Sequence, residues 1–144
     1  MRRLVSLLLV LALALCVAGV SRATAPAFVV IVNADNPTLT VGRKFLTDAF
    51  LKKITRWPHG ELIRPVDQAQ ESDVRRRFTD DVLKRSVAAV RSYWQQLIFA
   101  GRDVPPPEVG NDEQVIEYVQ KHSGSVGYVS AAAKLSRVKV VGVE

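Results

Sequence analysis

The pattern of hydrophobic and polar positions predicts alternating strands and helices beyond the N-terminal segment. A continuous apolar run over residues 28–32 indicates a strand that is buried on both faces. Similar runs predict further strands over residues 62–66, 125–129 and 138–143. Pro65 places the 62–66 strand at a sheet edge or at a strand end, because proline has no N–H to donate.

Apolar residues recur at helical spacing in the segments between these strands. A first helix begins at Thr40 or Gly42 and buries an apolar stripe that includes Phe45 and Phe50. Three further helices begin at residue types that cap free amides. These caps are Ser72, Ser86 and Asn111. We also predict a short helical turn over residues 131–133. Strands separated by helices predict an α/β layered domain.

The N-terminal residues have the layout of a secretory signal peptide. Two arginines precede an apolar run over residues 4–20, and small residues follow it. We expect cleavage after Ala23, which leaves residues 24–144 as a single domain. This domain would be periplasmic or secreted. Cleavage after Ala25 is the alternative, although it would leave Pro26 at the new N-terminus.

Two other interpretations of the same segment are less favoured. Cys16 resembles a lipid-attachment cysteine, but Leu15 stands where that motif has a small residue. The second interpretation is an uncleaved membrane anchor, but the apolar run over residues 4–20 has only the minimum length for a membrane span. We therefore predict export without stable membrane insertion.

Charge and composition narrow the function classes. Removal of residues 1–23 lowers the formal net charge from +6 to about +3, which suits a small anionic ligand and is too low to indicate nucleic acid. The same cleavage removes the single cysteine, so the domain would have neither a disulfide nor a thiol nucleophile. His59 lies in a predicted turn and His122 at a predicted helix end, and neither has a metal-ligand partner at a known spacing. We expect no enzyme activity and no cofactor.

One place has a physical rationale for binding an anion. Ser72 starts a helix whose free amides favour negative charge, Arg75 lies in its first turn, and Arg64 ends the preceding strand. These three residues form the candidate oxyanion site. The alternative is that Ser72 is only a cap and that Arg75 is a surface charge.

Several motifs together resemble the phosphate-type periplasmic substrate-binding proteins of ABC transporters. Residues 50–57 are similar to the Phe-x-Gly-x-Ile-x-x-Trp pattern of that family, and residues 63–78 to its loop of Arg, Asp and Ser before a helix. Residues 124–129 look like its Gly-x-Ile-Gly-Tyr strand. The resemblance covers residues 28–143. It implies one lobe of a type 2 periplasmic binding protein, a three-layer sandwich in which helices flank a mixed sheet.

The sequence departs from the family in the phosphate loop and in length. The family loop has Ser-Gly-Thr, but here Asp73 and Val74 follow Ser72, so the implied phosphate binding transfers at most to Ser72 and Arg75. The family closes two lobes around its ligand, whereas this chain is long enough for one. We expect a binding module for phosphate or a similar anion, connected with a transporter. The alternative is a ligand-free domain that binds an envelope protein or a second copy of itself.

Overall fold

The computed structural model describes residues 27–144, so the predicted signal peptide and its cleavage sites lie outside the described residues. Five strands form one mixed sheet in the order β2-β7-β1-β6-β3, and a separate pair joins β4 to β5. The strands are β1 (Phe28–Asn33), β2 (Thr40–Val41), β3 (Arg64–Pro65), β4 (Asp67–Gln68), β5 (Glu108–Val109), β6 (Ser125–Ser130) and β7 (Val138–Val143). The helices are α2 (Arg43–Phe50), α3 (Asp73–Phe78), α4 (Val87–Phe99) and α5 (Asp112–Lys121).

Strand β1 is the centre of the sheet. It runs antiparallel to both β6 and β7, while β2 and β3 join the outer edges in parallel pairings. The predicted strand over residues 28–32 is therefore confirmed, with one more residue at its end. The predicted strand over residues 62–66 is reduced to Arg64–Pro65, because the chain before it pairs instead as a hairpin between Arg56 and Leu62.

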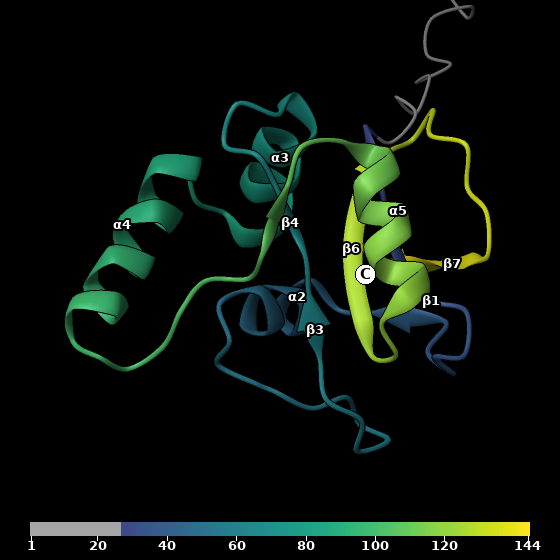
Figure 1. Cartoon of the computed structure of the whole chain (residues 1–144), viewed down its shortest axis with the longest axis horizontal. Helices are drawn as coiled ribbons and strands as arrows, with labels where there is room; N and C mark the ends of the chain where they lie inside the picture. Colours follow the sequence, from purple (N-terminus) through teal and green to yellow (C-terminus); the bar gives the residue numbers. More distant parts are fainter. Residues whose placement is uncertain (1–26) are drawn as a thin grey trace, which may run out of the picture.

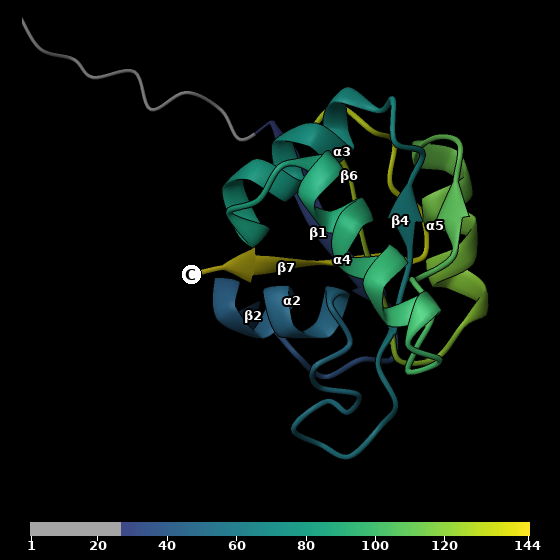
Figure 2. The same cartoon turned by 90° about the vertical axis from the view of Figure 1, so that its left-hand side faces the viewer.

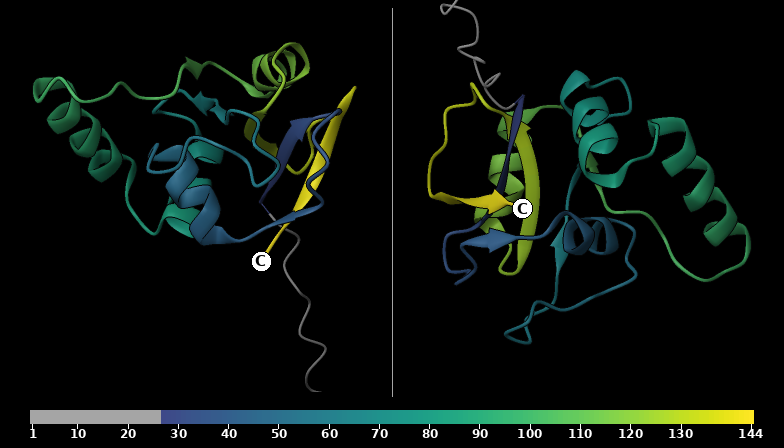
Figure 3. Two further views of the ribbon diagram at one scale, coloured as in Figure 1. Left: turned by 90° about the horizontal axis from the view of Figure 1, so that it is seen from below. Right: turned by 180° about the vertical axis from the view of Figure 1, so that it is seen from behind.

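Helices cover both faces of the sheet, which confirms the predicted three-layer α/β fold (Figure 1). Because side chains alternate along a strand, Val30 and Val32 enter the larger core with α2, α3 and α4, whereas Ile31 enters a smaller core under α5. Figure 2 shows the three helices of the larger core in front of the sheet. Helix α4 lies farthest from the sheet, as the view from below in Figure 3 makes clear.

The predicted helix starts agree with the structure. Gly42 is the N-cap of α2, and the hydroxyls of Ser72 and Ser86 accept backbone N–H bonds at the starts of α3 and α4. Asn111 caps α5 in the same way. These local bonds need only neighbouring residues, which is why the sequence predicts them.

Two predicted segments differ in the structure. The helix from Ser72 changes after Phe78 into a π-helix, η1 (Thr79–Leu83), and Lys84 then adopts a left-handed conformation that ends it. The segment over residues 131–133 is a single turn, closed by the bond from the Ala133 N–H to the Ser130 carbonyl. It reverses the chain between β6 and β7 and does not extend into a helix.

Gly127 in β6 allows α5 to approach the sheet closely. A Cβ at this position would lie 2.7 Å from a methyl of Val115 and 2.9 Å from a methyl of Val66, both completely buried. We therefore expect Gly127→Ala to lower the free energy of unfolding by about 1–3 kcal/mol, because the packed core must shift to admit a methyl group. Gly42→Ala is the matched control, since a Cβ there meets no atom within 4 Å. Equal urea midpoints for the two variants would contradict this account of the packing.

Candidate functional site

A buried polar network connects α3 to the small β4–β5 pair and to β6. Its centre is Arg75, whose side chain is only 3% exposed. The guanidinium Nη2 lies 3.1 Å from Asp67 Oδ2, and Nη1 lies 2.8 Å from Glu108 Oε1. Nη1 also donates to the Gln68 carbonyl at 2.6 Å. A single arginine therefore contacts both residues of β4 and one residue of β5.

The Ser72 hydroxyl is also engaged by its neighbours. It accepts the Arg75 backbone N–H at 3.2 Å and donates to Gln68 Oε1 at 2.7 Å. The Gln68 side-chain amide donates in turn to Asp112 Oδ1 at 2.9 Å and to the Tyr128 carbonyl at 3.0 Å. The start of α3 is thus fixed to the sheet through one glutamine.

Asp67 carries the buried negative charge of this network. The Tyr128 hydroxyl donates to its carboxylate, and the Tyr128 ring stacks on Phe78 with centroids 3.9 Å apart. Burial raises the pKa of Asp67, against the opposing effects of the Arg75 guanidinium and the Tyr128 hydroxyl. Because Asp67 and Glu108 both contact Arg75, two carboxylates share one guanidinium.

An open hollow of about 410 Å³ lies beside Ser72, between the starts of α3 and α4. Its polar wall includes the capping hydroxyls of Ser72 and Ser86 and the Arg76 guanidinium. Glu71 and Asp80 line the same hollow, so its charge is mixed. Free amides at both helix starts favour an anion here, and the two carboxylates oppose it.

The structure brings two of the three predicted site residues together. Ser72 and Arg75 are joined by a hydrogen bond, but the Arg75 side chain points into the core, so the alternative of a surface charge is wrong. Arg64 lines a different hollow of about 260 Å³, together with Lys52 and Asp103. The assignment of these residues to an oxyanion site stays a prediction.

The partners of Arg75 were not found from the sequence. These partners, Asp67, Gln68 and Glu108, all lie in strands of only two residues, which have no clear sequence pattern. Glu108 is also distant from Arg75 along the chain, and no spacing rule relates the two residues. The one available signal was a pair of polar residues, Asp67 and Gln68, directly after an apolar strand pattern. Such a pair is equally typical of a solvated loop.

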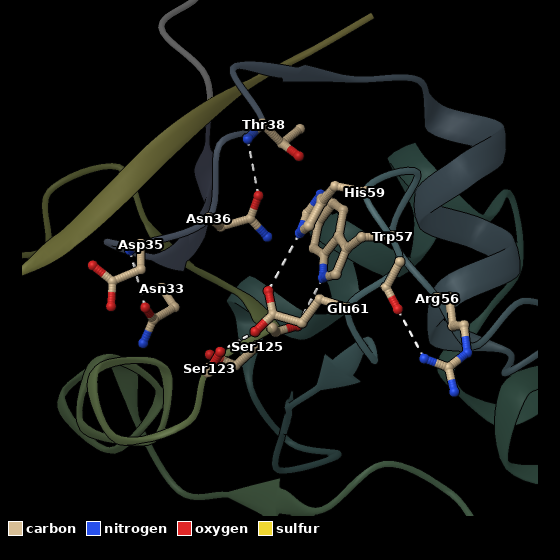
Figure 4. Close-up of polar contacts among 12 residues, drawn as sticks. Asn33, Asp35, Asn36, Thr38, Arg56, Trp57, His59, Glu61, Ser123 and Ser125 are labelled. Carbon is tan, nitrogen blue, oxygen red and sulfur yellow. Dashed lines mark hydrogen bonds and ion pairs between the residues drawn. The ribbon is translucent and has the colours of Figure 1, made fainter.

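A second polar cluster fastens the hairpin around His59 to the start of β6 (Figure 4). Glu61 accepts a hydrogen bond from the Ser123 hydroxyl and lies 3.3 Å from His59 Nε2, and these contacts hold the pKa of Glu61 below its usual range. Trp57 Nε1 donates to the Gly124 carbonyl at 2.9 Å, and the His59 ring stacks on the Trp57 ring. Since the carboxylate lies between the serine and the histidine, the imidazole does not contact the hydroxyl. The contacts of this cluster join the hairpin to the chain just before β6.

Residues 27–144 contain neither a cluster of metal-ligand side chains nor a membrane-spanning helix. No group of three or more His, Cys, Asp or Glu side chains in this part of the chain could hold a metal ion. Its helices are all too short or too polar to cross a membrane.

The network predicts a large effect of Arg75 on stability. We expect Arg75→Met to lower the free energy of unfolding by about 3–5 kcal/mol, because it leaves the buried Asp67 carboxylate without its counter-ion. The matched control is Arg76→Met, which removes an exposed ion pair with Asp73 and should cost less than about 1 kcal/mol. Urea unfolding of both variants measures the difference.

The same variant should show a defined pH dependence. Burial raises the pKa of Asp67, and a carboxyl whose pKa is raised in the folded state favours folding more as pH falls and less as pH rises. Without Arg75 the pKa of Asp67 rises further. The decrease in the free energy of unfolding caused by Arg75→Met should therefore be smaller at about pH 5 than at about pH 7.5. A loss that is the same at both values would mean that Asp67 is not the uncompensated group.

Comparison with known proteins identifies the fold. No profile of a known protein family matches the sequence, and no curated protein matches it. Among solved structures, a protein of Clostridium perfringens assigned as a phosphate ABC transporter substrate-binding protein, with bound phosphate, is 21% identical with a TM-score of 0.65. That match covers 81% of this chain and 44% of the other.

Two further receptors give the same result. An ABC-type phosphate transport receptor of Vibrio cholerae is 18% identical with a TM-score of 0.58, and covers 81% of this chain and 46% of its own. PstS of Borrelia burgdorferi is 12% identical with a TM-score of 0.63, over 82% and 47% of the two chains. This chain spans less than half the length of each of the three. It therefore has the fold of one lobe of a phosphate-type binding protein, as the sequence resemblance predicted.

Proposed function

We propose that this chain is an exported, single-lobe binding module that takes phosphate or a similar small oxyanion in connection with an ABC transporter. The observation that carries the proposal is the shared fold with structures named as phosphate transport receptors, one of which holds phosphate. The mildly basic charge expected after signal cleavage supports an anionic ligand. The module has no enzymatic role in this proposal.

The anion would contact the chain at the Ser72 hollow. Its wall offers the Ser86 hydroxyl, the first backbone amides of α4 at Val87 and Ala88, and the Arg76 guanidinium. The Ser72 hydroxyl already donates to Gln68. Arg75 lies behind the wall and supplies little net charge, since Asp67 and Glu108 neutralise it. Arg64 lines another hollow and would act only at long range.

Affinity for the isolated lobe should be low. The hollow is open to water, which weakens each charged contact, and the chain covers less than half of the related receptors. Tight capture would require a second wall from another protein or from a second copy. We therefore expect a dissociation constant for phosphate of about 1–10 mM.

Titration of residues 24–144 with phosphate, followed by calorimetry and by backbone amide shifts, tests the proposal. Shifts should concentrate at residues around the hollow, and Ser86→Ala should weaken binding several-fold, because a hydroxyl donor is lost from its wall. Ser92→Ala is the matched control, since Ser92 is an exposed serine of α4 outside the hollow. No heat and no shifts at about 10 mM phosphate would contradict the oxyanion proposal.

A different observation favours a second function, protein recognition without a small ligand. Helix α4 ends in Phe99, which is 90% exposed, and Ile98 and Val104 beside it are also exposed. Large apolar side chains in such a position are typical of a contact surface. Capture of an envelope protein that is unchanged in Ser86→Ala and lost in Phe99→Ser would favour this function over anion binding.

A further inference from the structure

Arg75 and Glu108 lie at the boundary between core and solvent. The Arg75 side chain is 3% exposed, whereas that of Glu108 is 38% exposed, and Nη1 and Oε1 are 2.8 Å apart. The Glu108 carboxylate therefore reaches from the surface to a buried cation. It occupies the outer side of the guanidinium, and Asp67, whose side chain is 12% exposed, occupies the inner side.

The arginine has more donor capacity than its protein partners use. Nη1 and Nη2 contact Asp67, Glu108 and the Gln68 carbonyl, but the Nε atom is buried and has no hydrogen-bond partner among the described residues. Nε shares one edge of the guanidinium with Nη2, which contacts Asp67, and it is not adjacent to Nη1, which contacts Glu108. Without Glu108, Nη1 would lose a carboxylate acceptor on the side nearer to solvent. An oxygen of a small oxyanion could accept the same charge-assisted hydrogen bond.

Glu108 is positioned by a stiff segment. Residues 105–107 are three prolines, and the Asp67 N–H donates to the Pro107 carbonyl at 2.9 Å. The following Glu108 pairs with Asp67 as part of the β4–β5 pair. The carboxylate is therefore presented to Arg75 by a rigid backbone and does not reach it by chance from a mobile loop.

We propose that Glu108 is a built-in ligand that closes an oxyanion site on Arg75, and that a small external carboxylate or phosphate takes its place when the Glu108 side chain is removed. The chain thus blocks its strongest anion-binding group with its own carboxylate. This inference rests on the proposed function. It adds a physical reason why the isolated lobe would bind anions weakly.

Glu108→Ala tests the inference by anion rescue. The substitution removes a side chain that ends in a carboxylate, so acetate or phosphate can re-enter beside Arg75. In Glu108→Ala, acetate and phosphate should raise the melting temperature by about 3 °C or more over chloride at equal ionic strength. In the unaltered chain and in Glu117→Ala, where only the weak site proposed at the Ser72 hollow is open, the rise in melting temperature should be clearly smaller. Glu117 is the matched control, since it is an exposed glutamate paired with Lys121.

One further variant and one further measurement keep the test decisive. Rescue should disappear in Glu108→Ala combined with Arg75→Lys, because lysine lacks the planar fork. If Glu108→Ala does not fold in chloride, acetate or phosphate at equal ionic strength should restore its far-UV circular dichroism spectrum. Absence of rescue in Glu108→Ala, or rescue that persists after Arg75→Lys, would overturn the inference. Rescue in Glu108→Ala with no phosphate binding by the unaltered chain would contradict the proposed function alone.

Discussion

The structure depends on the burial of one guanidinium. Arg75 cannot be placed in a protein core unless carboxylates and carbonyls surround it, because the cost of removing a charge from water is several kcal/mol. Asp67, Glu108 and the Gln68 carbonyl meet that requirement. They come from two strands of two residues each, which are too short to be stable by themselves. The arginine therefore fixes both the start of α3 and the β4–β5 pair.

This constraint also limits the chemistry of the site. A guanidinium that already has two carboxylates attracts an added anion weakly, and the hollow beside Ser72 adds Glu71 and Asp80 to the negative charge nearby. The fold is that of one lobe of phosphate-type receptors, but the charge of Arg75 is balanced by carboxylates within the chain. The proposed binding of an anion by the lobe alone would therefore be weak, and a second wall from another protein would strengthen it by excluding water.

Sequence reasoning predicted those features that depend on neighbours along the chain. The apolar run at residues 28–32, the caps Ser72 and Ser86, and the alternation of strands with helices were all readable locally and are confirmed. The inward direction of Arg75 was not readable, because its partners are set by tertiary pairing across the β4–β5 pair. The separation of Arg64 from Ser72 has the same cause: the chain between them turns from one sheet into another.

The central claim is that Arg75 and Asp67 stabilise the fold as a coupled pair. A double-mutant cycle with Arg75→Met and Asp67→Asn, measured by urea unfolding at neutral pH, tests it most directly. We predict a coupling energy of about 2 kcal/mol or more, because each substitution alone leaves the other group buried without its partner, and the double variant leaves neither. A coupling energy near zero would contradict the account and would mean that the two side chains contribute independently.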